Sequence, residues 1–470
     1  MSARYLTTTL PYVNDSPHMG HALEFVQADV LARSWRLAGD EVFFSMGTDE
    51  HGQKIFEAAQ KVEQEPKQYV DHYASEFKKL KNALNLSNDA FIRTTDQAHV
   101  LAAQEMWRRC AASGDVYKKA YTGLYCVGCE AFKTEKEIVD GKCPLHPNAE
   151  LKEVSEENYF FRFSKYQDQL LAYLERPNVV IPEWRRIEAV NFAKGGLEDF
   201  SISREKSRLS WGIPVPGDDS QIMYVWFDAL TNYISTLGWP TDEKGNFKKF
   251  WEDGETLQVA GKDQLRFQSL MWQAMLMSAN IKLTDRIFYH GFINSGGQKM
   301  SKSLGNVINP LELVEKYGTD AVRYIFLRHV SPTEDSDLTL DAIHDHYTAH
   351  LTNGLGNLVA RVMQLAESNI GSFSGTHSQT DFIALEQFDF HKALDTIWSR
   401  IQKLDQTITE TKPFAVVKEN PSEGKRMIDE LRTELFFIAQ ILEPYMPATS
   451  KKIYDAVVAN KKPENLFPRL

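Results

Sequence analysis

The sequence is poor in cysteine, with four in 470 residues, and the last three of these lie between positions 126 and 143. A secreted protein stapled by disulfides would carry more cysteines, spread more evenly along the chain. No apolar run is long enough to cross a bilayer, and no basic and apolar leader precedes the first strand-like stretch at 5–10. We therefore expect a cytoplasmic protein with no membrane partner.

Positive charge is also scarce, since the chain has 53 Lys and Arg against 64 Asp and Glu, a net charge of −11. This balance argues against a protein that holds nucleic acid by bulk positive charge, although a local basic groove remains possible. Internal repeats and low-complexity tracts are lacking. With 43% hydrophobic and 11% aromatic residues, the chain is long enough for two to four globular units.

The first fifty residues have the order of an α/β fold. Residues 4–10 are β-branched and aromatic and predict a strand, 20–37 have apolar positions at helical spacing, and 41–46 predict a second strand. Strand, helix, strand is the opening of a Rossmann-type, doubly wound parallel sheet. Ligands of such sheets bind at the carboxyl ends of the strands.

A long insertion interrupts this pattern, and a helical region follows it. The α/β pattern returns with an expected strand at 257–260 and helix at 264–278, while amphipathic segments at 351–367, 388–411 and 423–441 predict an all-α bundle. We expect the first half of a split α/β domain at 1–116, a connective insertion at 117–223, its second half at 224–290, a connecting segment at 291–345 and a helical domain at 346–470.

The strongest local motif is Pro-His-Met-Gly-His at 17–21, where the first helix begins. A helix amino terminus offers unpaired N–H groups, and His18 and His21 share one helical face there, directed at a bound anion. Gly20 between them would let a base or sugar approach the backbone. Taken alone, the two histidines are equally compatible with metal ligands or surface residues.

A second motif, Lys-Met-Ser-Lys-Ser at 299–303, has glycines on both sides. Lys299 and Lys302 on such a loop can swing onto a polyphosphate and neutralise charge that develops during in-line displacement. By itself, this motif could equally be a solvated basic turn.

The cysteines form a third motif, in which two close pairs are separated by a short loop. Four ligands of this kind suit tetrahedral zinc, and no position is left for a substrate water, which indicates a structural site. A redox pair or a chance cluster is the alternative. The expected ligands are Cys126, Cys129, Cys143 and His146.

Together and in this order, the histidine and lysine motifs resemble the paired signatures of class I aminoacyl-tRNA synthetases. The resemblance implies that Asp263, in Gly-Lys-Asp at 261–263, holds the ribose of ATP. It also implies catalytic roles for His18, His21, Lys299 and Lys302. The remaining ATP contacts that it implies are Gly20, Glu24, Gly261, Ser301 and Ser303.

Within this class the chain most resembles the methionyl-tRNA synthetase family. The insertion is too short for the large editing domain of the Ile, Val and Leu enzymes, and no cysteine in the first strand could supply the zinc thiolate of the cysteine enzyme. Polarizable sulfur packs well against aromatic edges. The methionine pocket that the resemblance implies comprises Leu10, Tyr12, Asp49, Arg204, Trp226, Ala229, Tyr233, Gln268 and Trp272, in which Asp49 holds the ammonium group and pairs with Arg204. Without that resemblance, Trp272 would be read as core packing.

The chain departs from the family at two positions. Gln268 stands where the family usually has histidine, and it keeps a donor and an acceptor but cannot be protonated. Phe414 stands where a tryptophan usually stacks on the first anticodon base. The resemblance also implies that Asn357 and Arg361, one helical turn apart, read the anticodon; alone they would be an ordinary solvent-facing stripe.

The resemblance implies ATP-dependent ligation of L-methionine to tRNA(Met), initiator tRNA included, through a methionyl-adenylate, with one structural Zn²⁺ and with Mg²⁺ bound to ATP. We expect a monomer, since the chain stops soon after the helical bundle. One alternative is a nucleotidyltransferase of the His-x-Gly-His superfamily acting on a small molecule. Another is a non-catalytic zinc-bearing RNA-binding module.

Overall fold

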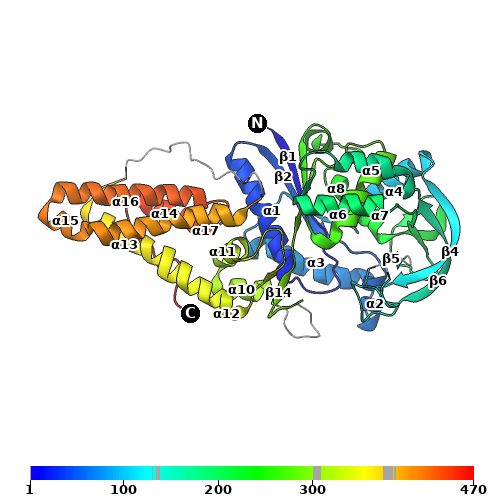
Figure 1. Cartoon of the computed structure of the whole chain (residues 1–470), viewed down its shortest axis with the longest axis horizontal. Helices are drawn as coiled ribbons and strands as arrows, with labels where there is room; N and C mark the ends of the chain where they lie inside the picture. Colours follow the sequence, from blue (N-terminus) through cyan, green and yellow to red (C-terminus); the bar gives the residue numbers. More distant parts are fainter. Residues whose placement is uncertain (1, 130, 134–137, 300–307, 374–384, 386–387) are drawn as a thin grey trace. The chain divides into compact units, whose positions relative to one another are not determined.

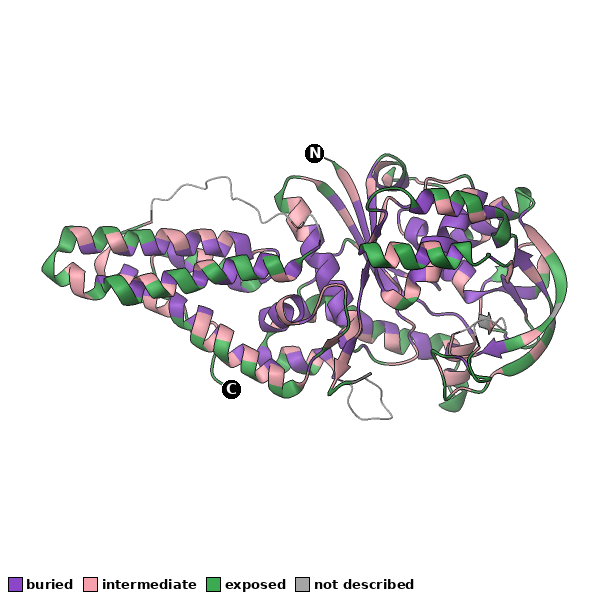
Figure 2. Cartoon of the chain, viewed as in Figure 1, coloured by how far each residue is buried: buried purple, intermediate pink, exposed green. Residues whose placement is uncertain are grey.

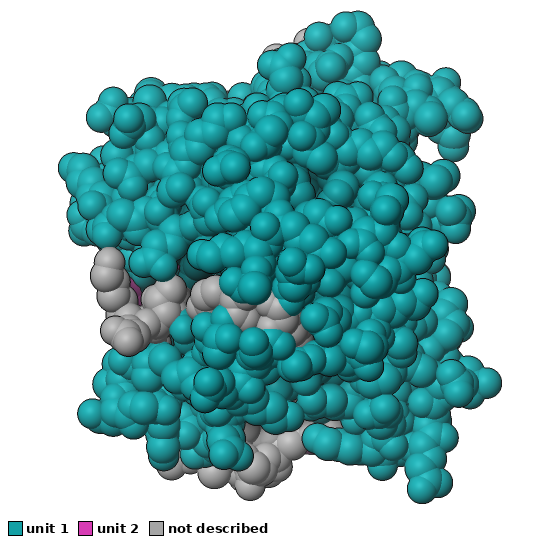
Figure 3. Space-filling model, turned by 90° about the vertical axis from the view of Figure 1, so that its right-hand side faces the viewer, with its two compact units in different colours: residues 1–17, 40–79, 88–289 teal, residues 18–39, 80–87, 290–470 magenta. Residues whose placement is uncertain are grey.

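A computed structural model of the chain (Figure 1) describes all residues except 1, 130, 134–137, 300–307, 374–384 and 386–387. The chain forms two compact units, which Figure 3 colours separately. Unit 1 comprises residues 1–17, 40–79 and 88–289, and unit 2 comprises residues 18–39, 80–87 and 290–470.

The centre of unit 1 is a six-stranded sheet with the order β3-β2-β1-β12-β13-β7. β1 pairs in parallel with both β2 and β12, so the strand order reverses beside β1. β12 is buried along nearly its whole length, as parallel strands covered on both faces are. The strands are β1 (Ala3–Thr8), β2 (Glu41–Thr48), β3 (Ala90–Arg93), β7 (Val180–Ile181), β12 (Glu255–Gly261) and β13 (Arg286–His290).

Helices and a large aromatic core accompany this sheet in unit 1. Trp251, Trp272 and Tyr289 are among its fully buried side chains. The helices are α2 (Gln53–Lys61), α3 (Pro66–Ala83, whose last residues belong to unit 2), α4 (Gln97–Ala112), α5 (Gln167–Leu174), α6 (Glu183–Lys194), α7 (Val225–Leu230), α8 (Asn232–Ser235) and α9 (Trp272–Ser278).

Two small antiparallel sheets occupy much of the region expected as an insertion. They consist of β4 (Val116–Cys126), β5 (Ala131–Lys133), β6 (Lys152–Phe161) and β8 (Phe200–Ser201), and of β9 (Ser203–Glu205), β10 (Pro214–Val215) and β11 (Asp218–Met223). One strand of this region belongs to neither small sheet. β7 pairs in parallel with β13 and so joins the main sheet. The expected domain boundaries remain predictions.

Unit 2 is mainly helical. Its helices are α1 (Met19–Leu37), α10 (Pro310–Tyr317), α11 (Thr319–His329), α12 (Leu340–His346), α13 (Asn357–Asn369), α14 (Phe390–Thr411), α15 (Pro413–Glu419), α16 (Pro421–Leu442) and α17 (Pro447–Ala459), and its short strands are β14 (Ile293–Ser295), β15 (Gln298–Lys299) and β16 (Ser336–Asp337). Figure 2 shows α14 and α16 with one buried and one exposed side, the amphipathic pattern that their sequences predict. Proline occupies the first turn of α10, α15, α16 and α17, where its missing N–H costs nothing.

Most expected elements are confirmed to within a few residues, with two local exceptions, at 264–278 and at the start of the segment expected at 351–367. The helix expected at 264–278 is a 3₁₀ turn, then a π-helical segment at Phe267–Met271, and only then α9. A π-helical segment also joins α12 to α13, at Tyr347–Gly356. Such segments are frequent at functional sites, and the first of these carries the buried Gln268.

A buried carboxylate holds α1 in place within unit 2. Asp29 is fully buried, forms an ion pair with Arg323 Nη1 at 2.7 Å and accepts from Arg33 Nε at 2.8 Å. It also accepts from the Ser87 backbone N–H at 2.6 Å and from the Ser87 hydroxyl at 2.7 Å. Burial by itself would raise the pKa of Asp29, but the two guanidinium charges outweigh it and hold this pKa below its usual range.

All three nitrogens of the Arg323 guanidinium group also have partners. Arg323 is fully buried and donates to the backbone carbonyl oxygens of Leu84, Pro444 and Tyr445 at 3.0, 2.8 and 2.9 Å. One side chain on α11 therefore binds α1, the end of α3 and the turn after α16. Since both members of the ion pair are satisfied, the arrangement avoids the cost of a lone buried charge.

Replacing Arg323 with Met leaves the Asp29 carboxylate buried without its main counter-charge. We expect the free energy of unfolding to fall by about 3–5 kcal/mol, measured by urea unfolding followed by circular dichroism. The control is Arg426→Met, which removes an exposed ion pair with Glu423 and should cost less than about 1 kcal/mol. Equal losses for the two variants would contradict this account.

Candidate active site

The segment after β1 and the residue after β2 meet at the carboxyl edge of the main sheet. Tyr12 and Asp49 form a parallel bridge, in which the Asp49 N–H donates to the Pro11 carbonyl at 2.9 Å. Asp49 is buried, with 2% of its surface exposed. A Cβ on Gly47 would lie 2.9 Å from Leu10 Cδ2 and 2.1 Å from the Ile92 carbonyl oxygen, so only glycine fits beside Leu10. Three of the expected methionine-pocket residues thus lie together.

Aromatic rings from α7, α8 and α9 extend this group. The Tyr12 and Trp226 rings meet edge to face at 6.3 Å, and Trp226 stacks on Phe267 at 3.8 Å. Tyr233 and Trp272 form a second edge-to-face pair at 5.7 Å. Their edges and faces provide the polarizable surface that a thioether prefers.

Gln268 hydrogen-bonds one member of the second aromatic pair, Tyr233. Its Nε2 donates to the Tyr233 hydroxyl at 2.5 Å, and the side chain is fully buried. Within the part of the chain that the structure describes, Gln268 Oε1 and Trp272 Nε1 are buried without a hydrogen-bond partner. Buried polar atoms normally have partners, so these two offer an acceptor and a donor to a bound molecule.

The other two expected pocket residues are also buried in unit 1. Ala229 lies on α7 with 5% of its surface exposed. Arg204 donates to the Ser201 hydroxyl at 2.9 Å and to the Ser203 carbonyl at 2.7 Å. Its pairing with Asp49 remains a prediction.

Two histidines and an aspartate form a buried network beside the expected methionine-pocket residues. The sequence patterns did not predict this network. Asp228 is fully buried and bonds His51 Nδ1 and His99 Nε2, each at 2.7 Å, and His99 Nδ1 bonds the Ser235 hydroxyl at 2.9 Å. Burial raises the pKa of Asp228, but His51 and His99 outweigh this and lower it. Asp228 follows Trp226 by two residues, so this network fixes α7. The sequence pattern around each residue gave no sign that the three meet.

In unit 2, the two signature histidines cap α1. His18 Nδ1 accepts the Gly20 N–H at 3.1 Å, His21 Nδ1 accepts the His18 N–H at 3.3 Å, and the rings stack at 3.7 Å. They share one face, as expected. A nitrogen that accepts carries no proton, so each neutral ring carries its proton on Nε2. Burial, with His18 and His290, lowers the pKa of His21 well below its usual value.

The glycine between these histidines has a steric role of its own. A Cβ on Gly20 would lie 2.9 Å from His18 Cε1, so glycine lets the imidazole fold back over the helix end. One turn further along α1, the buried Glu24 bonds His290 Nε2 at 2.9 Å. A role of Gly20 in ligand approach remains a prediction.

The other expected ATP contacts are only partly described. Gly261 ends β12 in unit 1, and Asp263 is exposed in the turn that follows. Lys299 lies in β15, in unit 2. Ser301, Lys302 and Ser303 lie outside the described residues.

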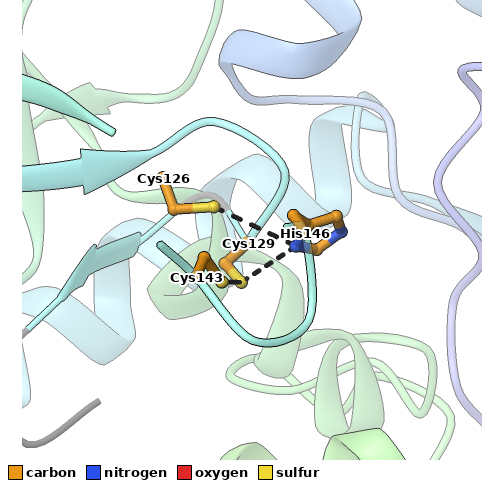
Figure 4. Close-up of side chains that lie close together, drawn as sticks. All are labelled: Cys126, Cys129, Cys143 and His146. Carbon is orange, nitrogen blue, oxygen red and sulfur yellow. Dashed lines mark hydrogen bonds between the residues drawn. The ribbon is translucent and has the colours of Figure 1, made fainter. Parts of the chain in front are cut away.

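The four expected metal ligands converge in unit 1 (Figure 4). Cys129 Sγ lies 3.4 Å from Cys143 Sγ and 3.2 Å from His146 Nδ1, and all four ligand atoms lie within 4.8 Å of one another. A Cβ on Gly128 would lie 2.5 Å from His146 Cγ, so glycine is needed where the histidine crosses the hairpin between β4 and β5. This cluster can bind a metal, because soft thiolates and one imidazole form a complete tetrahedral donor set.

The metal-ligand cluster also contacts one of the expected methionine-pocket residues. The remaining cysteine, Cys110, does not belong to the cluster. Trp226 Nε1 donates to the Cys129 carbonyl at 3.4 Å. Cys110 is a free thiol, fully buried on α4, and burial raises its pKa to about 12. A buried thiol is what the sequence predicted for Cys110.

The three expected anticodon-binding residues lie at the surface of the helical region. Asn357 is exposed and Arg361 half-buried on α13, and Arg361 pairs with Asp405 of α14 at 2.5 Å. Phe414, on α15, has 47% of its surface exposed. An exposed aromatic ring and an arginine suit unpaired bases.

Among the described residues, none of the helices combines the length and apolar character that crossing a bilayer requires.

We expect the purified protein to contain about one metal ion per chain, because the cluster supplies four protein ligands. Cys126→Ser combined with Cys129→Ser should remove it, as measured by inductively coupled plasma mass spectrometry. Cys110→Ala, which removes a thiol of similar burial outside the cluster, should retain the ion. A metal content unchanged in the double variant would contradict the assignment.

Known proteins resemble this chain over nearly its full length. A family model described as "tRNA synthetases class I (M)" matches residues 4–154 and 147–363. A methionine–tRNA ligase of Caldanaerobacter subterraneus subsp. tengcongensis is 39% identical over 471 residues, covering 96% of this chain and 73% of that protein. Another, from Rhizobium meliloti, is 40% identical over 474 residues, covering 96% and 91%.

Solved structures agree with these sequence matches. A structure of Mycobacterium tuberculosis methionyl-tRNA synthetase in complex with methionyl-adenylate has a TM-score of 0.89 at 36% identity and covers 100% of this chain and 98% of that one. Its apo form has a TM-score of 0.83 at 33% identity. Similarity of this extent shows that the chain belongs to the methionyl-tRNA synthetases, a family of class I tRNA synthetases.

Proposed function

We propose that this chain ligates L-methionine to tRNA(Met), initiator tRNA included, in two ATP-dependent steps for protein synthesis. The observation that supports this most is the group of aromatic rings of Tyr12, Trp226, Tyr233 and Trp272, with the Asp49 backbone bridged to Tyr12, in a chain of this family. Membership of the family sets aside a small-molecule nucleotidyltransferase and a non-catalytic RNA-binding module. The activity belongs in the cytoplasm, where tRNA is used.

In the proposed complex, Asp49 holds the methionine ammonium group, and Arg204 supports that carboxylate. The thioether packs among the aromatic rings, with Leu10 and Ala229 limiting the size of the side chain that fits. Gln268 Oε1 and Trp272 Nε1 take the polar partners that the described residues do not supply. A pocket of this kind orients the substrate without forming a covalent bond to it.

For ATP, we propose that His18 and His21 donate from Nε2 to phosphate oxygens. Their tautomer supports this role, since each Nδ1 already accepts a backbone N–H. The family resemblance adds Gly20, Glu24, Gly261 and Asp263 as ATP contacts, with Asp263 assigned to the ribose. Lys299, Ser301, Lys302 and Ser303 would bind the pyrophosphate part, and Mg²⁺ enters as part of the ATP substrate.

The first step is an in-line displacement. A methionine carboxylate oxygen bonds the α-phosphorus while the bond to the bridging β-phosphate oxygen breaks, and pyrophosphate leaves. In the second step, a hydroxyl oxygen of the terminal ribose of tRNA attacks the methionyl carbonyl carbon, AMP leaves, and the hydroxyl proton is released. Placement of neutral donors and lysine charges lowers the barrier, and no protein nucleophile is needed.

We propose that the ion of the Cys126, Cys129, Cys143 and His146 cluster is Zn²⁺ with a structural role. Three thiolates and one imidazole match zinc, and the closed donor set leaves no position for substrate. Through the hydrogen bond from Trp226 to the Cys129 carbonyl, a bound ion would hold Trp226 in position in the proposed pocket.

We assign the helical domain at 346–470 to anticodon binding, with Asn357, Arg361 and Phe414 as base contacts. Phe414 can stack on an unpaired base, and stacking contributes about 1–3 kcal/mol per base. The split catalytic domain at 1–116 and 224–290, the insertion at 117–223, the connecting segment at 291–345 and the monomeric state complete the proposal.

Methionine-dependent exchange of pyrophosphate into ATP tests the first step. Across a panel of the twenty standard amino acids, we expect exchange to depend on methionine far more than on any other. No methionine-dependent exchange, or faster exchange with leucine or isoleucine, would refute the proposed substrate.

Gln268 gives a sharper test of the pocket. Gln268→Leu strands the buried Tyr233 hydroxyl and removes Oε1, so we expect KM for methionine to rise about tenfold, which corresponds to about 1.4 kcal/mol. KM for ATP should stay unchanged. Gln268→His, the matched control, should keep methionine binding but gain a pH dependence below 6.5, because burial disfavours the charged imidazole. A tenfold rise in both KM values for Gln268→Leu would point to general damage and contradict the role.

A further inference from the structure

Three histidines from α11, α12 and the π-helical segment that follows α12 in unit 2 lie together outside the proposed active site. His329 is the last residue of α11, His346 the last of α12, and His350 follows four residues later in the π-helical segment. The rings of His329 and His346 stack at 3.6 Å, and His350 lies 5.2 Å from the first and 5.6 Å from the second. One ligand atom from each lies within 4.8 Å of the other two.

We propose that His329, His346 and His350 form a binding site for a divalent transition-metal ion of the zinc type, separate from the cysteine cluster. Two histidines four residues apart project from one face of a helix, a spacing that allows both to hold one ion. The third ligand comes from a neighbouring helix. Three imidazoles favour zinc, nickel, cobalt or copper over magnesium or calcium, which prefer oxygen.

A single hydroxyl lies near two of the three ligands. His350 Nδ1 lies 2.9 Å and His329 Nε2 lies 3.4 Å from the Tyr324 hydroxyl oxygen. Arg328 Nη1 also donates to this oxygen, and a hydroxyl oxygen has two lone pairs, so one of the two rings can donate to it as well. If His350, the nearer ring, is that donor, its lone pair remains on Nε2. Metal-binding histidines characteristically donate their second nitrogen to such a partner.

The hydroxyl is itself held in position. Tyr324 stacks on Trp398 at 4.3 Å, and Arg328 Nη1 donates to the Tyr324 hydroxyl at 2.7 Å. The Arg328 guanidinium also lies 4.9 Å from the centre of the Trp398 ring. The partner of His350 is therefore packed in place before an ion arrives.

The electrostatic surroundings keep the three rings neutral, which is the form that binds metals. Burial lowers the pKa of all three, that of His329 to about 3, and the neighbouring charges of Arg328 add to the effect. Asp345 acts in the opposite direction on His346. Two other groups near the three histidines have partners outside the cluster. Arg328 is paired with Asp395 at 3.1 Å, and His391 bonds the Val330 carbonyl at 2.5 Å.

Ion binding would require one adjustment and would have one structural effect. An ion cannot lie in the planes of two stacked rings at once, so His329 and His346 must tilt apart around it. The bound ion would then link the end of α11 to the helix that continues into α13. Since α13 carries Asn357 and Arg361, the ion would brace the helix proposed to read the anticodon.

Nickel binding to the untagged, full-length protein with its resident metal in place tests the proposal. After equilibrium dialysis against NiCl₂, mass spectrometry should find about one Ni²⁺ per chain in addition to the resident metal. His346→Asn and His350→Asn should each lose this ion. His344→Asn, on the same helix but packed against Tyr317, should retain it.

Two further measurements keep the test decisive if a variant folds poorly. Co²⁺ bound to the wild-type chain should show ligand-field bands without thiolate charge transfer, which separates this site from the cysteines. Tyr324→Phe should weaken Ni²⁺ binding about 10–100-fold. The proposal is overturned if no Ni²⁺ binds beyond the resident metal, if the histidine variants retain it, or if the added Co²⁺ shows thiolate bands.

Discussion

The buried ion pair between Asp29 and Arg323 determines the arrangement of unit 2 around α1. Asp29 is paired with two guanidinium groups and accepts from Ser87, and Arg323 adds bonds to three backbone carbonyls in two segments far apart in the sequence, at Leu84 and at Pro444 and Tyr445. Apolar packing alone would tolerate small rotations of α1. The charged network does not, because any shift leaves a buried charge unpaired. The histidines that begin α1 are therefore held on a fixed helix.

Unit 1 uses the same principle beside the proposed methionine pocket. Asp228 is satisfied on both oxygens by His51 and His99, and its place on α7 fixes the neighbouring Trp226 and Ala229. Trp226 also bonds the backbone of the metal cluster. A rigid polar support suits a pocket that must distinguish methionine from residues of similar size, since a difference of one methylene gives little discrimination by itself.

Local pattern in the sequence predicted much of the fold, and motif resemblance predicted most of the candidate site. The strands at β1 and β2, helix α1 and the long helices of unit 2 follow from periodicity and proline positions. The ion pair of Asp29 with Arg323, the Asp228 network and the position of β7 join residues distant in the chain, so no local pattern reveals them. The π-helical segment at Gln268 was also missed, because the apolar spacing there is that of an ordinary helix. The net charge of −11 suggested no nucleic acid partner, yet a few surface residues such as Arg361 and Phe414 suffice for the proposed contact.

The proposed activity joins methionine to tRNA. Its most direct test incubates the purified protein with labelled methionine, ATP, Mg²⁺ and a tRNA transcript that carries a CAU anticodon. The account predicts label attached at the terminal ribose of this tRNA, and much less on a transcript differing only in its anticodon. Formation of methionyl-adenylate without any label on the tRNA, or equal labelling of both transcripts, would contradict it.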